Sequence, residues 1–182
     1  IKLFMNILNK IISNFKNNKR LYIGEKVTMS EHMIQTAMIA EENNSSKSLI
    51  CACLLHDYGH FIVDDPELLV SKELDGKHEE IGFDFLKKYF LPEVTEPIKL
   101  HVLAKRYLCR NKSYYDHLSQ ASKVSLKLQG GVMNNEEEKK FTSLKFYKDA
   151  IKVREYDDSG KIPNIKIKSI DDYQELISSQ LI

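Results

Sequence analysis

The chain is poor in residues that break or bend secondary structure, with only 7 glycines and 4 prolines among 182 residues. Its apolar residues recur mostly at three- and four-residue spacing, which is the period of a helix and not the alternation of a strand. Hydrophobic residues make up 42% of the chain, enough for a core that needs no disulfides. The sequence therefore predicts an all-α fold in a single domain spanning residues 1–182.

The chain also has few cysteines, almost no net charge and no long apolar run. The 3 cysteines give no disulfide framework, and Cys51 and Cys53 lie in an apolar run that favours core packing as reduced thiols. The 27 basic and 26 acidic residues form no basic block, which argues against nucleic-acid binding. No stretch approaches the ~20 apolar residues of a membrane span, and residues 1–12 lack the apolar core of a signal peptide. We therefore expect a cytoplasmic protein that binds neither nucleic acid nor membrane.

Helix boundaries can be read at several points. Thr28 and Glu31 form a capping box for a helix that runs to about Glu42. Ser45 or Ser46 can cap the next helix, and an amphipathic helix over residues 2–15 makes residues 1–20 an N-terminal helical extension. Further helices are expected over residues 77–90, 93–108, 117–129, 146–157 and 170–180, with residues 134–140 as a charged loop or helix start.

The most informative feature is the pair His56-Asp57, placed where the apolar run of residues 51–55 ends and followed by His60. A carboxylate and an imidazole at the buried end of a helix are costly to desolvate unless something binds them. A metal ion is the usual solution, because it converts buried lone pairs into coordination bonds.

Other scarce histidines complete a candidate ligand set. The four imidazoles and two carboxylates that fit together are His32, His56, Asp57, His78, His101 and Asp157. Such a set can hold two metal ions if Asp57 bridges them. Mixed nitrogen and oxygen ligation suits iron, manganese or zinc better than calcium or magnesium.

The order His…His-Asp…His…His…Asp resembles the HD-domain superfamily. The resemblance narrows to the phosphonate-cleaving HD-domain oxygenases (PhnZ-like) and covers residues 22–173. It is carried by residues 22–27, 30–35, 101–108, 118–122, 128–131 and 154–158. It implies an HD-domain helical bundle with a dinuclear metal site in its core.

The resemblance also implies the chemistry. The six ligands would hold two iron ions in a mixed-valent Fe(II)/Fe(III) state, with dioxygen as co-substrate. The enzyme would cleave the C–P bond of a 1-hydroxyalkylphosphonate to phosphate and a carboxylic acid. The expected substrate is 2-amino-1-hydroxyethylphosphonate, which gives glycine, although a trimethylammonium or unsubstituted compound stays open. A 2-oxoglutarate-dependent phosphonate hydroxylase would act one step earlier.

Several polar residues fit a dianionic phosphonate. Three of them, Ser122, Ser125 and Gln129, recur at helical spacing and share one face. Lys105 lies one turn after the ligand His101, and Arg154 and His60 lie close to other ligands in the chain. A phosphonate needs such a set of hydrogen-bond donors.

The resemblance assigns roles to three residues near the front of the chain. Glu25 would read the cationic amine of the substrate, and Tyr22 would occupy the dioxygen position until substrate arrives. Gln35 would contact substrate or bound oxygen from the face of His32. The chain departs from the family at Tyr58, where a small aliphatic residue is expected, and at Val132, where a proline is expected.

Two other functions stay open at this point. A metal-dependent HD phosphohydrolase acting on a nucleotide or other phosphate ester would use the metals to generate a hydroxide nucleophile. A non-catalytic HD module could bind a small anion as a sensor. The full set of six ligands, with Tyr22 and Glu25, favours the oxygenase.

Overall fold

The structure is a computed structural model that describes residues 2–22, 24–62 and 77–182. Within these residues the chain forms helices and two isolated β-bridges but no strand, so the all-α prediction is confirmed. The main helices are α1 (Lys2–Asn17), α2 (Met29–Glu42), α3 (Lys47–Leu55), α5 (His78–Leu86), α6 (Pro92–Leu108), α7 (Lys112–His117), α8 (Gln120–Leu128), α9 (Asn135–Thr142), α10 (Tyr147–Ser159) and α11 (Gln174–Ser179). Short 3-10 turns are η1 (Tyr58–Phe61) and η2 (Ile170–Tyr173).

The helix starts follow local capping chemistry. Thr28 accepts a hydrogen bond from the backbone of Glu31, whose side chain accepts one in return, so the predicted capping box is confirmed. Ser46, and not Ser45, caps α3. Asn134 and Glu137 form a second capping box, so the charged segment near residue 134 begins the helix α9.

The helix expected over residues 117–129 begins later than predicted, because α8 spans Gln120–Leu128. The chain breaks at Leu118, which is extended, and Ser119 caps a new helix by accepting from the backbone of Ser122. His117 ends the preceding helix α7. The capping residue Ser119 was the sequence signal for this later start.

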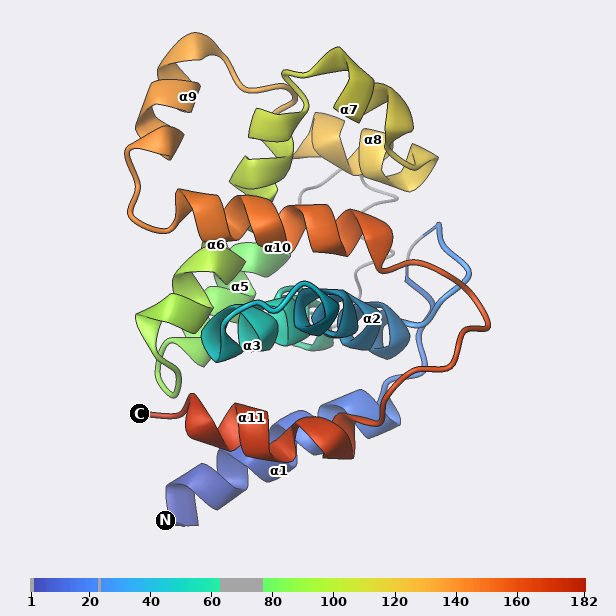
Figure 1. The fold of residues 1–182 in the computed structure, drawn as a ribbon, viewed down its shortest axis with the longest axis vertical. Coiled ribbons are helices and arrows are strands. Elements are labelled where there is room, and N and C mark those ends of the chain that lie inside the picture. Colours follow the sequence, from blue (N-terminus) through green and yellow to red (C-terminus); the bar gives the residue numbers. More distant parts are fainter. Residues whose placement is uncertain (1, 23, 63–76) are drawn as a thin grey trace.

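Five helices surround the candidate site. Helix α10 packs against α6 and α2, and α3 packs against both α2 and α6 (Figure 1). The shorter α5 packs on α6 and on η1, the turn that follows the His-Asp pair. The ligands expected on α2, α3, α5, α6 and α10 are therefore brought toward one centre.

The N-terminal helix contributes to the main core. Ile11 and Phe15 of α1 are buried in the same apolar cluster as α2 and α3. Asn14 donates a 2.7 Å hydrogen bond to the hydroxyl of Tyr58, which is fully buried. Helix α1 thus supports the residue that directly follows Asp57. Cys51 and Cys53 are buried free thiols, as predicted. None of the described helices is long and apolar enough to cross a membrane.

Candidate metal centre

The histidines of the centre are aimed by hydrogen bonds on their far sides. His56 ends α3 and donates from Nδ1 to the carbonyl of Cys53 at 2.8 Å. His101 on α6 donates from Nδ1 to Ile98 at 2.7 Å, and His32 on α2 donates to Gly160 at 2.9 Å. Because Nδ1 is used by a carbonyl in each case, Nε2 is left to face the centre.

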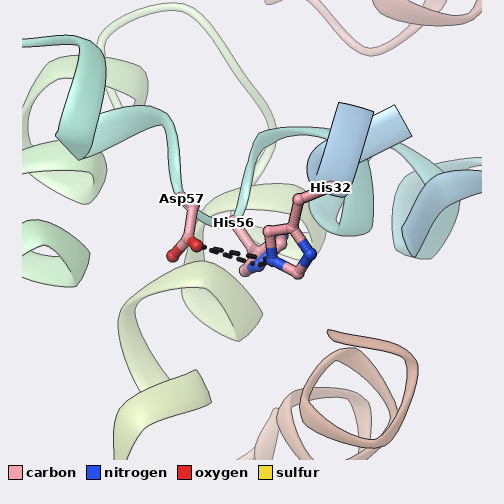
Figure 2. Close-up of side chains that lie close together, drawn as sticks. All are labelled: His32, His56 and Asp57. Carbon is pink, nitrogen blue, oxygen red and sulfur yellow. Dashed lines mark hydrogen bonds and ion pairs between the residues drawn. The ribbon is translucent and has the colours of Figure 1, made fainter. Parts of the chain in front are cut away.

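Asp57 lies between two pairs of histidines. Its Oδ2 lies 3.6 Å from Nε2 of His32 and 3.4 Å from Nε2 of His56 (Figure 2). Its Oδ1 lies 3.1 Å from Nε2 of His78 and 3.6 Å from Nε2 of His101. The ligand atoms form two groups that could each hold an ion, and Asp57 belongs to both.

The spacing within each group fits a transition metal. The Nε2 atoms of His32 and His56 lie 3.2 Å apart, and those of His78 and His101 lie 3.1 Å apart. Two nitrogens bound to one ion at about 2.1 Å would lie roughly 3.0–3.4 Å from each other. The observed separations match those of two ligands on one metal ion.

Asp157 joins the first group from the end of α10. Its Oδ1 lies 3.3 Å from Nε2 of His32. This oxygen and Oδ2 of Asp57 are both buried and accept no hydrogen bond among the described residues, although imidazole nitrogens lie 3.3–3.6 Å away and Nζ of Lys161 lies 3.4 Å from the Asp157 oxygen. Buried carboxylate oxygens without partners are costly, and a cation between them removes that cost.

The charges of the centre also fit a cation. Burial would raise the pKa of Asp57, but His56 and the other nearby histidines hold it well below its usual range. Burial would lower the pKa of His32, but the carboxylates of Asp157 and Asp57 beside its Nε2 raise it to about 9. The acidic neighbours of His32 therefore favour a positive charge at this place, which a bound metal ion would supply.

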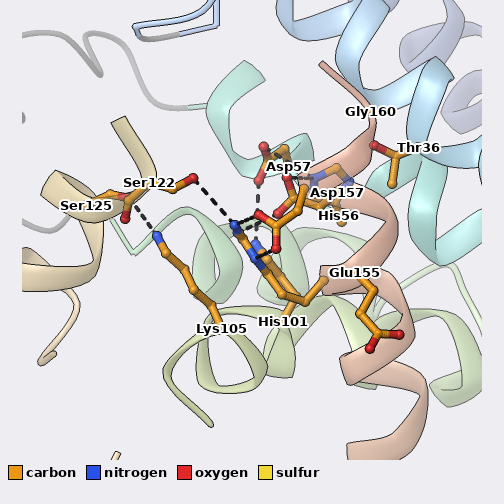
Figure 3. Close-up of polar contacts among 12 residues, drawn as sticks. Thr36, His56, Asp57, His101, Lys105, Ser122, Ser125, Glu155, Asp157 and Gly160 are labelled. Atoms are coloured by element: carbon orange, nitrogen blue, oxygen red, sulfur yellow. Dashed lines mark hydrogen bonds and ion pairs between the residues drawn. The ribbon is translucent and has the colours of Figure 1, made fainter. Parts of the chain in front are cut away.

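A group of polar side chains lies beside the centre. This group, called the polar cluster, consists of Lys105, Ser122, Ser125, Gln129 and Arg154. Figure 3 shows Lys105 pointing from α6 toward Ser125 on α8. Its ammonium donates to Ser125 Oγ at 2.6 Å and to Gln129 Oε1 at 2.9 Å. Burial and then the charge of Arg154 lower the pKa of Lys105 to about 7.

Arg154 is the buried cation of the polar cluster on α10. It donates to Oδ2 of Asp157 at 2.6 Å and also pairs with Asp158. Tyr114 on α7 bonds to both Arg154 and Asp158. A longer contact of 3.5 Å reaches Ser122 on α8. The guanidinium therefore lies between a metal ligand and the serine face predicted to bind substrate.

His60 and Tyr22 stack on histidines of the centre. The His60 ring lies 4.3 Å from that of His78 and is nearly parallel to it. Burial and the charge of His78 lower the pKa of His60 to about 3, so its imidazole is neutral near pH 7. The Tyr22 ring stacks on His32 at 4.5 Å. Burial, with the charges of Asp57 and Asp157, raises the pKa of Tyr22 well above 10.0.

The turn that carries Tyr22 and Glu25 lies against α8. Gly24 has a φ of +76°, and a Cβ at this position would lie 2.8 Å from that of Ala121. Only glycine fits both the conformation and the close approach. Oε1 of Glu25 is buried and has no hydrogen-bond partner among the described residues. Glu25, the carboxylate predicted to bind the amine of the substrate, is therefore held beside the helix that carries Ser122.

Gln35 has different neighbours from those its expected role requires. Its amide donates to the carbonyl of Ile162 at 2.9 Å and accepts from the amide of Ile162 at 3.0 Å. The Gln35 amide keeps a second N–H and a second lone pair beyond these two bonds, so its expected contact with substrate or oxygen stays a prediction. Of the two departures from the family, Tyr58 is buried, while Val132 is exposed.

Two residues near the centre, Lys161 and Tyr114, were not predicted from the sequence. Lys161 lies with Nζ 3.4 Å from Oδ1 of Asp157. Its spacing from Asp157 offered a signal, but Gly160 between them ends the helix. Tyr114 offered no signal, because its contact with Arg154 depends on how α7 packs.

Comparisons with known proteins agree with this geometry. A model of the HD domain family matches residues 29–142. The [1-hydroxy-2-(trimethylamino)ethyl]phosphonate dioxygenase (glycine-betaine-forming) of Leisingera caerulea is 45% identical over 141 residues, which are 77% of this chain and 72% of the relative. The hydroxymethylphosphonate dioxygenase of Gimesia maris is 39% identical over 162 residues, 88% of this chain and 81% of the relative. An uncharacterized protein of Acanthamoeba polyphaga mimivirus is 37% identical over 163 residues, 88% of this chain and 74% of the relative.

The chain therefore belongs to the HD-domain family, where its relatives place it among the phosphonate dioxygenases. The predicted family resemblance and the predicted enzyme class, an oxygenase, are confirmed. The two named relatives differ in the group attached to the hydroxylated carbon, so they do not fix the substituent on this enzyme's substrate.

Proposed function

We propose that the enzyme uses dioxygen to cleave the C–P bond of a 1-hydroxyalkylphosphonate, giving phosphate and a carboxylic acid. One observation carries the proposal: each oxygen of Asp57 faces its own pair of histidines. The names of the two dioxygenase relatives support it. The reaction balances without an external reductant, because one oxygen atom of dioxygen enters each product while the C–H and C–P bonds break.

The proposed cofactor is a pair of iron ions in a mixed-valent state. His32, His56 and Asp157 would hold one ion, His78 and His101 the other, and Asp57 would bridge them. Iron in this donor set would supply the redox chemistry with dioxygen that attacks the C1–H bond. The protein's own part is to aim the imidazoles of His32, His56 and His101 through their Nδ1 hydrogen bonds and to keep both carboxylates ionised.

The polar cluster is proposed to bind the phosphonate group. Lys105 already holds two hydroxyl or amide oxygens at hydrogen-bond distance, so a phosphonate oxygen can replace one of them. Arg154 supplies a charge that its acidic neighbours keep on the guanidinium at any physiological pH. His60, a neutral imidazole, adds one N–H donor without adding charge.

Glu25 is proposed to select a cationic substituent. Its buried Oε1 lacks a donor, and a primary ammonium provides one, whereas a trimethylammonium has no N–H to give. This favours 2-amino-1-hydroxyethylphosphonate, with glycine as the product. Tyr22, stacked on His32, is proposed to cover the dioxygen position before substrate binds, and Gln35 to face it from α2.

The substrate carries a hydroxyl on the carbon bonded to phosphorus, which must come from an earlier hydroxylation. We propose a 2-oxoglutarate-dependent phosphonate hydroxylase as its source. We place the reaction in the cytoplasm, where the buried thiols of Cys51, Cys53 and Cys109 remain reduced.

The test is phosphate release by the iron-loaded enzyme in air and in a glovebox. The panel holds 2-amino-1-hydroxyethylphosphonate, its trimethylammonium analogue, hydroxymethylphosphonate and a phosphate monoester. We expect release from the phosphonates in air alone. Release from the monoester without dioxygen, with no reaction of any phosphonate, would identify a phosphohydrolase instead.

A further inference from the structure

Lys161 is a buried cation near the metal centre that the proposed function leaves without a task. Its side chain is only 9% exposed, and Nζ lies 3.4 Å from Oδ1 of Asp157. The same ammonium lies over the ring of Tyr22, 5.2 Å from the ring centroid. A lysine is costly to bury unless its charge is compensated, so the position of this side chain needs an explanation.

The backbone before Lys161 is fixed against α2. Gly160 accepts the hydrogen bond from Nδ1 of His32 at 2.9 Å. Thr36, one turn further along α2, lies next to Gly160 (Figure 3). A Cβ on Gly160 would lie 2.6 Å from Oγ1 of Thr36, so the chain passes as close to the helix as glycine allows.

The backbone after Lys161 is fixed by Gln35. Both polar atoms of the Gln35 amide pair with the backbone of Ile162, at 2.9 and 3.0 Å. Lys161 is therefore held on both flanks by residues of the helix that carries His32.

The backbone of Tyr22 is held by hydrogen bonds within its turn, whereas its ring is placed by contacts with other side chains. It lies outside the helices, in the turn where its amide donates to the carbonyl of Val27 at 2.8 Å. Its ring contacts His32, with 4.5 Å between centroids and 28° between planes, and the ammonium of Lys161. A cation over a desolvated aromatic ring is strongly attracted to it.

We propose that Lys161 is a positioning residue that holds the Tyr22 ring against His32 in the substrate-free enzyme, with Gln35 fixing the backbone from which Lys161 acts. The inference rests on the proposed function, which gives Tyr22 the task of covering the metal. In this proposal, the contact between Lys161 and the ring decides how firmly Tyr22 stays in its covering position.

The chain contains no tryptophan, so Tyr22→Trp places a single fluorescent indole at this position. The reporter is loaded with zinc, which has no redox chemistry, and quenched with acrylamide, which is neutral. We expect Lys161→Met to raise the quenching constant at least twofold. Loss of a cation–π contact changes the ratio of enzyme with the ring packed on His32 to enzyme with the ring exposed by about 2- to 30-fold. Lys161→Arg keeps a cation over the ring and should restore low quenching.

Lys168→Met is the matched control. Lys168 also pairs with a carboxylate, Glu41 at 2.7 Å, and lies over a tyrosine ring, Tyr173 at 5.5 Å, but its side chain is 47% exposed. It should leave the reporter unchanged. Equal quenching with and without Lys161→Met, or an equal rise in Lys168→Met, would overturn the proposal.

A second measurement asks whether Lys161 acts through Tyr22 or through its charge on the metal. The probe is nitric oxide, a neutral ligand, added to the anaerobic ferrous enzyme without substrate. We expect Lys161→Met to speed binding by about 2- to 30-fold, and to have no further effect in a Tyr22→Leu background. Additive effects of the two substitutions would overturn the proposal. The zinc-loaded reporter involves no turnover, so its outcome is separate from that of the phosphate-release test.

Discussion

Oδ1 of Asp57 lies 3.1 Å from Nε2 of His78, which leaves its other oxygen turned toward the histidines of α2 and α3. One carboxylate therefore contacts two separate pairs of imidazoles. The two pairs come from helices that are distant in the chain, so Asp57 is the residue that joins them into one centre.

Asp57→Asn should reduce the bound metal from two ions per chain to at most one. The amide keeps the size of the side chain, but it is neutral and offers a single oxygen, so it cannot serve both groups of ligands. Elemental analysis after anaerobic iron loading and desalting gives the count. Asp84→Asn is the control, because Asp84 is exposed and pairs with Lys87. Two ions retained in Asp57→Asn would contradict the bridging role.

Metal binding should release a proton from His32. Its pKa of about 9 means that this imidazole is protonated at neutral pH, and a metal ion must displace that proton. The pKa of His101, lowered by burial to about 3, means that His101 releases none. Apparent affinity should therefore rise about tenfold per pH unit until pH reaches the pKa of His32.

Calorimetric titration with ferrous iron in buffers of different ionisation enthalpy measures this release. At least one proton per chain is expected near neutral pH. Binding that is independent of pH and of the buffer would show that His32 is neutral before the metal arrives.

The pH profile of kcat/KM should carry a falling limb with an apparent pKa of about 7, set by Lys105. Lys105 is charged below this pH and binds the phosphonate in that form, so activity is lost as pH rises through the pKa. Lys105→Arg stays charged and should remove the limb, although its altered geometry lowers the maximum. An unchanged limb in Lys105→Arg would assign the titration to another group.

Glu25→Gln should lower kcat/KM for one substrate and not for another. Loss of a charge-assisted hydrogen bond costs about 1.5–3 kcal/mol, which is roughly a 10- to 150-fold drop in kcat/KM. The drop is expected for 2-amino-1-hydroxyethylphosphonate, while hydroxymethylphosphonate should be spared because it has no ammonium. Glu155→Gln on the exposed side of α10 should change neither (Figure 3). Equal losses on both substrates in Glu25→Gln would make Glu25 a structural residue.

Asn14→Ala should lower the free energy of unfolding by about 1–3 kcal/mol, because the buried hydroxyl of Tyr58 would lose its donor. Adding Tyr58→Phe should recover part of the loss, since it removes the unpaired hydroxyl. Urea unfolding of the single and double variants measures both effects. Asn17→Ala on the exposed part of the same helix is the control. Additive losses in the double variant would show that the two side chains are not coupled.

Much of the centre could be predicted because its chemistry is local and its residue types are rare. Only 6 histidines occur in the chain, and the His56-Asp57 pair stands at a helix end that the apolar run before it makes visible. The capping box of Thr28 and Glu31 depends only on residues three apart, so it fixed the start of the helix that carries His32.

The rest depends on tertiary contacts that no spacing records. Lys161 reaches Asp157 only because Gly160 and Ile162 are bonded to α2, and these contacts join residues far apart in the chain. The start of α8 was predicted too early because the cap at Ser119 stands among residues that themselves favour a helix, and α7 was not predicted. Tyr114 reaches Arg154 from that unpredicted helix.

The most direct test of the account is to count dioxygen consumed against phosphate released by the iron-loaded enzyme turning over 2-amino-1-hydroxyethylphosphonate. An oxygen electrode and a phosphate assay on the same sample give the ratio. Oxidative cleavage of the C–P bond predicts one dioxygen per phosphate, with an equal amount of glycine. Phosphate released with no uptake of dioxygen would contradict the oxygenase and point to hydrolysis.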